Sequence, residues 1–184
     1  MLTSSLIGRL SRFTRDRRGV SAVEFAFIAP VMIGLYLGCT EISDGIAADR
    51  KVSLVVDSLA NLPSEVTTIS TSDMTNILNA ASSIISPYSA GNLTATVSCL
   101  TIDANKNVTV AWSATMNGTA RTVGSSVTIP AALAVAGTQL LLAEATYAYT
   151  PTVGYTITGT LTLSDKMYMA PRISAPTYNN VACT

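Results

Sequence analysis

Histidine is absent from this chain of 184 residues, and charged residues make up only 12% of it. Without an imidazole side chain, the protein cannot build a Ser-His-Asp triad, a Cys-His nucleophile or a zinc site with histidine ligands. The low charge and the positive mean hydropathy are unusual for a cytosolic enzyme. They fit a chain with one membrane segment and a threonine- and serine-rich part outside the cytoplasm.

The few charges are unevenly distributed, although their sum is zero. Residues 1–19 contain five arginines and one aspartate and therefore carry +4, which leaves −4 for the rest of the chain. Proteins that bind nucleic acid present a basic face with aromatic residues or a recognition motif, and this acidic remainder offers neither. The sequence therefore predicts no nucleic-acid partner.

Residues 20–40 form an apolar run whose only charged side chain is Glu24. As a helix, these 21 residues extend about 30 Å, the thickness of the hydrocarbon core of a bilayer. A cleaved secretory signal has a shorter apolar region and a small-residue cleavage site, whereas here apolar residues continue to Glu41. We therefore expect a retained transmembrane helix.

The charges on either side of this helix predict its orientation. Arginines precede it, and Glu41, Asp44 and Asp49 follow it. The positive-inside rule then places the N-terminus in the cytoplasm and exports the C-terminal part. The predicted domains are a basic leader at 1–19, a transmembrane helix at 20–40 and an exported domain at 41–184.

The carboxylate inside the apolar run has two interpretations. A charge at the centre of a membrane helix costs about 2.5–3.5 kcal/mol and less near an interface, so Glu24 can be a tolerated interfacial acid. Alternatively, cleavage after Gly19 would make Val20 a free amino terminus, one helical turn before Glu24 on the same face. The carboxylate would then have a cationic partner, in its own chain or in a neighbouring subunit.

Three residues within the run indicate packing between helices. Pro30 removes a backbone hydrogen bond and tends to kink a helix, which membrane helices tolerate where neighbours satisfy the freed carbonyl group. An incidental kink is the other interpretation of this proline. Gly34 and Gly38 have the small-xxx-small spacing that lets helices approach closely, although glycine is frequent in such segments.

Beyond the membrane, two helical stretches are expected. The transmembrane helix continues as an amphipathic helix up to Pro63. A second helix runs from about Ser72 to Ser86, with Ser72 as its cap and Pro87 as its stop. The apolar residues at helical spacing are Ile42, Ile46, Val52, Val55, Val56, Leu59 and Leu62 in the first stretch, and Met74, Ile77, Leu78, Ala81 and Ile85 in the second.

The hydrophobic period then changes to two, which indicates strands and makes the exported domain α+β. Leu93–Cys99 and Val108–Met116 flank a turn at 105–107 and predict an antiparallel hairpin. A third strand is expected within Leu140–Tyr149, followed by alternating residues at 155–163 and a short stretch at 167–169. Alternation along the second strand predicts one buried face made of Val108, Val110, Trp112, Ala114 and Met116.

The chain contains three cysteines. Cys39 ends the membrane helix, where it is expected to be a small apolar filler, while Cys99 and Cys183 are both exported, where disulfides persist. We predict a disulfide between Cys99 and Cys183, because the tail at 177–184 has little apolar surface with which to hold itself. Metal binding by two cysteines without histidine is the weaker alternative.

The acidic residues do not predict catalysis. Asp103, Glu144 and Asp165 are scattered along the chain, and Ser164-Asp-Lys166 is too short a motif for a Ser/Lys nucleophile. Glu144 interrupts an apolar run and is expected on the polar face of a strand or against a partner. The sequence therefore predicts no enzyme, no catalytic residues, no cofactor, no metal and no small-molecule substrate.

Three blocks of sequence resemble the TadE/TadG-like family of pseudopilin-like assembly proteins, which serve the tight-adherence (Flp, type IVb) pilus. The blocks are RRGVSAVEFAFIAPV at 17–31, VSCLTIDANKNVTVAWSATMNGTA at 97–120, and the pair LLLAEATYAYTP at 140–151 and LSDKMYMAPRIS at 163–174. The first block carries the signal pattern, with a basic leader that ends in glycine and glutamate as the fifth residue of the helix. The chain departs from the family at Ala170, where arginine is frequent.

The resemblance implies cleavage after Gly19 by a prepilin peptidase, with Val20 as the new first residue and Glu24 as the signal glutamate. It also implies residence in the inner membrane, a periplasmic C-terminal domain, and other pilins, pseudopilins and the pilus assembly platform as partners. The protein would then take part in pilus assembly, either within the fibre or in the membrane. The alternative is a signal-anchored periplasmic domain that binds or adheres independently of any pilus.

Overall fold

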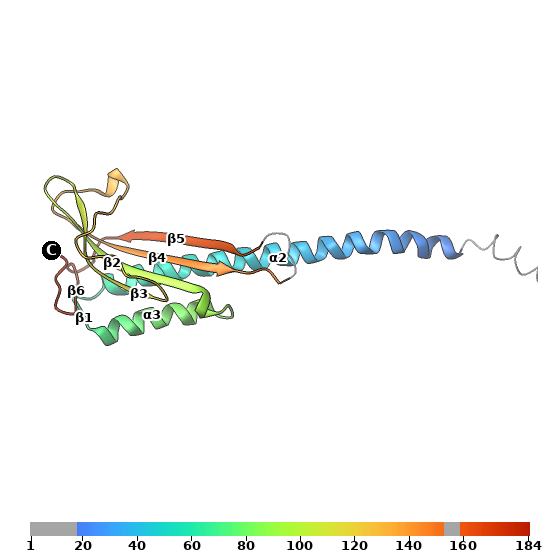
Figure 1. Cartoon of the computed structure of the whole chain (residues 1–184), viewed down its shortest axis with the longest axis horizontal. Helices are drawn as coiled ribbons and strands as arrows, with labels where there is room; N and C mark the ends of the chain where they lie inside the picture. The colour runs from blue at the N-terminus through green and yellow to red at the C-terminus, as the bar shows by residue number, and fades with distance from the viewer. Residues whose placement is uncertain (1–17, 153–158) are drawn as a thin grey trace, which may run out of the picture. The chain divides into compact units, whose positions relative to one another are not determined.

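The computed structural model describes residues 18–152 and 159–184, and it confirms the α+β class (Figure 1). Two helices and six strands make up its regular structure, together with the short 3-10 helices at 90–92 and 131–133. The chain divides into two compact units between Ile42 and Ser43, and this division falls inside the first helix. The elements in chain order are α2 (Arg18–Ser64), β1 (Thr68–Ile69), α3 (Thr71–Ile85), β2 (Leu93–Ile102), β3 (Val108–Met116), β4 (Gln139–Tyr149), β5 (Leu161–Met169) and β6 (Thr177–Tyr178).

Helix α2 confirms that the apolar N-terminal helix continues into the second unit. Its buried residues there are Ala48, Val52, Val55, Val56, Leu59 and Ala60. The predicted apolar stripe was partly wrong, because Ile42, Ile46 and Leu62 are 65%, 52% and 41% exposed. A helical stripe repeats every three to four residues, and Ile46 lies off the row that contains Val52 and Val55.

Helix α3 begins one residue earlier than predicted, and its cap is Ser70 instead of Ser72. The Oγ of Ser70 accepts a hydrogen bond from the Asp73 amide at 3.2 Å, and Asp73 Oδ2 accepts one from the Ser70 amide at 3.0 Å. This reciprocal pair satisfies two backbone N–H groups that the start of a helix leaves without partners. The buried face of α3 consists of Met74, Leu78, Ala81 and Ile85.

Strands β2 to β5 form one antiparallel sheet in the order β3-β2-β4-β5. The predicted hairpin and third strand are confirmed. The two predicted C-terminal stretches are in fact one strand, β5, because Leu161–Met169 pairs with β4 along its whole length. Residues 155–158 of the predicted alternation lie outside the described residues.

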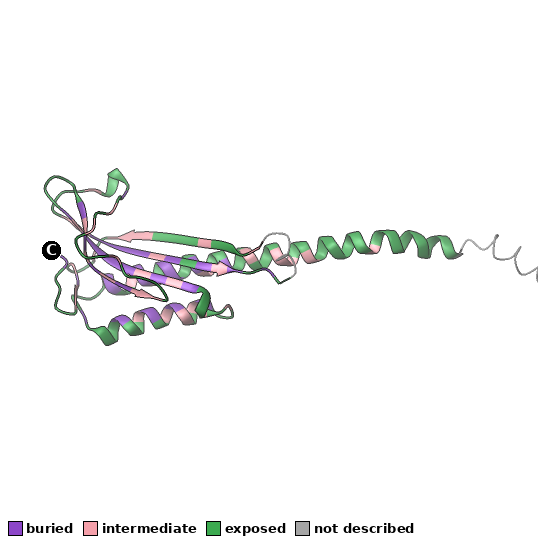
Figure 2. Cartoon of the chain, viewed as in Figure 1, coloured by how far each residue is buried: buried purple, intermediate pink, exposed green. Residues whose placement is uncertain are grey.

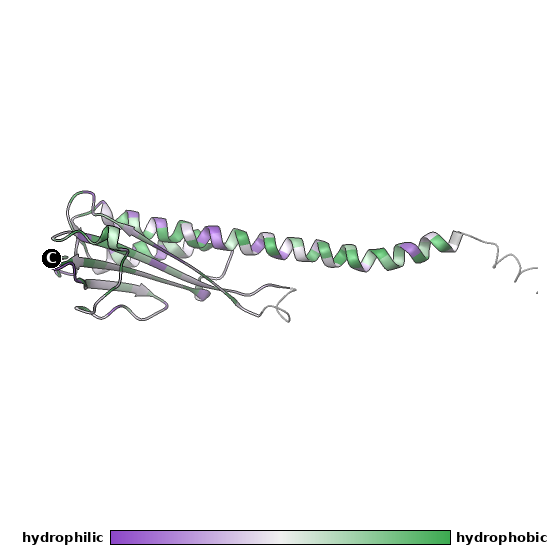
Figure 3. Cartoon of the chain, turned by 90° about the horizontal axis from the view of Figure 1, so that it is seen from above, coloured by the Kyte–Doolittle hydropathy of each residue, from purple (hydrophilic) through white to green (hydrophobic). Residues whose placement is uncertain are grey.

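The main core of the second unit lies between the sheet and the helices. Figure 2 shows the buried residues of α2, α3 and the sheet, and Figure 3 shows both helices on one side of the sheet. The sheet contributes its inward residues at every second position, as the alternation of a half-buried strand requires. They include Leu93, Ala95, Val97 and Cys99 on β2, and Leu141, Ala143, Ala145, Tyr147 and Tyr149 on β4.

A β-bulge divides strand β3 between two cores. Cys99 pairs with Trp112, but the next residue of β2, Leu100, pairs with Val110, so Ala111 is an extra residue on β3. Such an insertion reverses the side to which alternate residues point. The predicted single buried face is therefore wrong: Trp112 and Ala114 belong to the helix-side core, whereas Val108 and Val110 belong to a second cluster on the opposite face.

The segment at 117–138 covers that second cluster. Ile129 is buried against it, and Val127 and Ala134 pack on it. The same segment follows the outer edge of β3, where the Val127 amide donates to the Val108 carbonyl at 3.0 Å. The first residues of β3, Val108 to Val110, therefore have backbone hydrogen-bond partners along the outer edge of the sheet.

Candidate functional site

The first part of α2 presents its apolar side chains outward. By length and composition, α2 could cross a membrane (Figure 3), and none of its most apolar stretch is buried (Figure 2). It is the one such helix in the part of the chain that the structure describes. The most exposed large side chains of this stretch are Phe25, Phe27, Val31, Met32, Leu35 and Tyr36.

The predicted processing residues lie at the start of this helix. Gly19, Val20 and Glu24 all belong to α2, and all three are exposed. Val20 and Glu24 are separated by one helical turn, about 6 Å along the axis, so they lie on one face. The leader residues at 1–17 lie outside the described residues, and cleavage after Gly19 stays a prediction.

The predicted helix-packing residues follow within the same stretch. Helix α2 passes through Pro30 without ending. No other group lies within 4 Å of the positions that a side chain at Gly34 or Gly38 would take. The two glycines are one turn apart, so they leave a shallow notch on the helix surface where another helix could approach. Cys39, which is also exposed, follows Gly38 in the chain.

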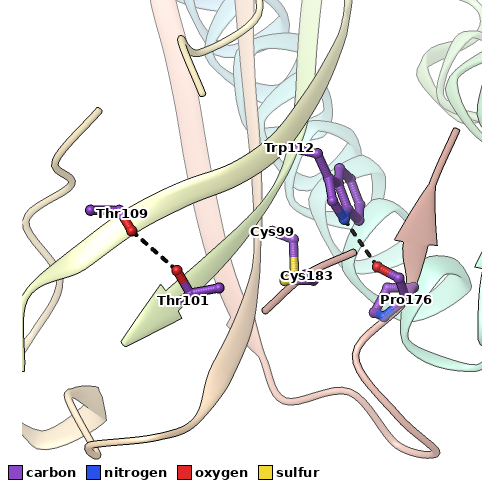
Figure 4. The surroundings of a disulfide bond; sticks show 6 residues. All are labelled: Cys99, Thr101, Thr109, Trp112, Pro176 and Cys183. Carbon is purple, nitrogen blue, oxygen red and sulfur yellow. Dashed lines mark hydrogen bonds between the residues drawn. A yellow bond between two sulfur atoms is a disulfide. The ribbon is translucent and has the colours of Figure 1, made fainter. Parts of the chain in front are cut away.

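Cys99 and Cys183 form a disulfide, and they are the pair that the sequence predicts (Figure 4). Their Cα atoms are 6.0 Å apart, a usual separation for this bond. Both residues are buried. The bond fixes the C-terminal tail to the centre of strand β2.

Contacts other than the disulfide also hold the tail. They correct the expectation that residues 177–184 could not pack against the domain without that bond. Strand β6 pairs with β1 in parallel, through Thr68 with Thr177 and Ile69 with Tyr178. The indole Nε1 of Trp112 donates to the Pro176 carbonyl at 3.0 Å (Figure 4), and its ring lies 5.4 Å from that of Tyr178. The disulfide therefore adds to hydrogen bonds and aromatic packing.

Asp103, Glu144 and Asp165 each have a hydrogen-bonding partner of their own. Asp103 accepts hydrogen bonds within its turn, from the Asn107 side chain and two amides at 2.8 Å each. Asp165 accepts from the Ser53 hydroxyl at 2.7 Å. No group of three cysteine or acidic residues that could hold a metal occurs within residues 18–152 and 159–184.

Glu144 lies on the polar face of β4, one of its two predicted places. Arg121 binds it in a bidentate pair, with Nε 2.9 Å from Oε2 and Nη2 2.7 Å from Oε1. Both side chains are about one-third exposed, at 36% and 29%. Sequence reasoning missed Arg121, because it lies in a segment without periodicity and only the fold brings it to β4.

Residues 19–59 match the family model of TadE-like protein. This match confirms the resemblance over the apolar stretch of α2 and the helical residues that follow it. No curated protein and no solved structure matches the chain.

Proposed function

We propose that the protein is a minor pseudopilin-like structural or assembly component of a tight-adherence (Flp, type IVb) pilus. A prepilin peptidase cleaves it after Gly19, and its helix α2 then joins other pilin helices. The observation that carries the proposal is the TadE-like match, which starts at residue 19 and includes Glu24. The chain acts as a structural component and not as an enzyme.

The exposed apolar surface of α2 supports this function. A long helix with no buried residue in its most apolar stretch needs lipid or other apolar helices around it. The same helix continues into a packed domain through Val52, Val55 and Leu59. Membrane attachment and domain presentation thus use one continuous element.

The proposed location is the inner membrane, with one span, a cytoplasmic N-terminus and a periplasmic domain. Arginines before the span and acids after it support this orientation. The partners are the membrane, the prepilin peptidase, other pilins or pseudopilins and the assembly platform. Protease treatment of spheroplasts is the check: the domain should be digested from outside, and its survival in intact spheroplasts would contradict the orientation.

The mature N-terminus decides between this function and an independent anchored domain. Mass spectrometry of the protein from cells that contain the peptidase should find Val20 as the first residue. Cells that lack the peptidase provide the control and should retain the leader. A retained Met1 in the presence of the peptidase would refute pilin-like processing and favour a signal-anchored binding or adhesion domain.

A further inference from the structure

The outward face of α2 in the second unit carries two charges among apolar residues. Ile46, Arg50, Leu54 and Asp57 follow one another at intervals of four, four and three residues, so they share one face. All four are exposed, Ile46 by 52% and Leu54 by 54%. The helix buries its opposite side against the sheet through Val52, Val55 and Leu59.

Arg50 and Asp57 have no salt-bridge partner among the described residues. Other polar groups of the same helix do contact the domain: Lys51 Nζ donates to the Ile84 carbonyl at 3.0 Å and Ser53 donates to Asp165. Seven residues separate Arg50 from Asp57, about 10.5 Å along the axis, which is too far for a pair within one chain. Both charges are thus available to another molecule.

We infer that this face docks the α2 helix of a second copy of the chain, parallel to it and shifted by seven residues. Arg50 of one copy then lies beside Asp57 of the next. The inference rests on the proposed function in one respect: membrane anchoring gives both helices the same direction.

The seven-residue shift follows from helix geometry. Seven residues are close to two turns, so a neighbour shifted by seven presents the same face again. Leu54 then meets Ala47, which is also exposed, and apolar contact is kept. Without a shift, Arg50 would face Arg50 and Asp57 would face Asp57, and such like-charge contacts are unfavourable.

The direct test is disulfide crosslinking between two differently tagged full-length copies in native membranes. Both copies carry Cys39→Ser, so that the remaining native cysteines, Cys99 and Cys183, are already joined to each other. One copy carries Ala47→Cys and the other Leu54→Cys, and we expect them to crosslink. Leu54→Cys in both copies is the matched control, with little crosslinking expected. Strong crosslinking in that control would overturn the inference, because it indicates an antiparallel pair centred on Leu54 or an unshifted one.

Charge reversal tests the register separately. Arg50→Asp or Asp57→Arg in both copies should each lower the crosslinking yield about threefold, within the range of exposed ion pairs. The double variant Arg50→Asp/Asp57→Arg should restore the yield, because opposite charges again meet across the copies. Equal yields in all four proteins, or no rescue in the double variant, would overturn the inference.

Mass spectrometry of the same samples separates the two proposals. Absent crosslinking from protein that begins at Val20 overturns the docking inference and leaves the pilin function standing. Crosslinking from protein that retains Met1 supports the docking inference and refutes the proposed processing.

Discussion

At the scale of single residues, the proposed function gives a role to Glu24, the one charged residue of the apolar run. Its carboxylate is exposed on α2, one turn after Val20. If assembly places it in an apolar surrounding, it needs the amine that processing creates. Burying an unpaired charge away from water costs far more free energy than burying a paired one. A glutamine at position 24 would be neutral, so the charged amino terminus would have no opposite charge beside it.

We predict that Glu24→Gln leaves membrane insertion intact and lowers piliation about tenfold or more, since loss of a buried charge partner costs about 3–5 kcal/mol. Membrane fractionation and electron microscopy of cells give the two readouts. Glu41→Gln is the matched control beyond the apolar run and should leave piliation close to wild type. Normal piliation with Glu24→Gln would show that this carboxylate has no part in assembly.

Asp103 offers a residue-scale test of the hairpin turn. The Asn107 side chain and backbone, and then the Asn105 amide, hold the pKa of the Asp103 carboxyl below its usual 3.8 by donating hydrogen bonds to it. Because the pKa is lowered on folding, this stabilisation is present above the unfolded pKa and is lost as the pH falls through the folded value.

NMR titration of the full chain in detergent should therefore give Asp103 a pKa below 3.8. Asn107→Ala should raise that pKa, because it removes the side-chain donor. Asn105→Ala is the control, since only the backbone amide of Asn105 contacts Asp103. An Asp103 pKa that Asn107→Ala does not move would refute this account of the turn.

At the scale of elements, the start of α3 offers a test of which serine, Ser70 or Ser72, caps the helix. The sequence predicted Ser72 as the cap, and the structure places the reciprocal bonds at Ser70 and Asp73. Ser70→Ala should lower the free energy of unfolding by about 1 kcal/mol, the usual effect of removing a cap. Ser72→Ala should cost less. Thermal unfolding of the full chain in detergent measures both, and a larger loss for Ser72→Ala would reverse the assignment.

The tail is the second element whose stability can be tested. The chain-entropy estimate for a closed loop of this length is about 4–5 kcal/mol. We predict that Cys99→Ser, Cys183→Ser and the double variant lose similar stability, because each removes the same bond. Cys39→Ser is the control and should have little effect. Thiol labelling under denaturing, non-reducing conditions checks the bond itself, and free labelling of both Cys99 and Cys183 would contradict it.

At the scale of the whole molecule, local sequence patterns were sufficient to predict most helices and strands. They were not sufficient to predict how these elements contact one another. The period of 3.6 in α2 and α3 and the period of two in β2, β3 and β4 are local properties of the chain, and they predicted these elements. The bulge at Ala111 depends on the register with β2, so alternation alone placed Val108 and Val110 on the wrong face. The parallel pair β1 and β6 joins two dipeptides too short to show any period.

The residues of the candidate site also differ in whether the sequence alone could predict their positions. Gly19, Glu24, Gly34 and Gly38 lie in one helix, as their spacing in the sequence predicts, and their roles in processing and helix packing stay predictions. Arg121 reaches Glu144 across 23 residues of chain, and no pattern links the two in the sequence. The Arg121–Glu144 ion pair could therefore be found only from the fold.

The pairing of β1 with β6 also has a consequence for the timing of export. In the proposed orientation, Thr68 would leave the membrane early, and its partner Thr177 and the disulfide residue Cys183 would follow more than a hundred residues later. Until those residues arrive, β1 has no strand beside it and Cys99 has no sulfur to join. In that orientation the domain would close only after translocation has reached residue 183, and a chain arrested earlier would carry an unpaired thiol at Cys99.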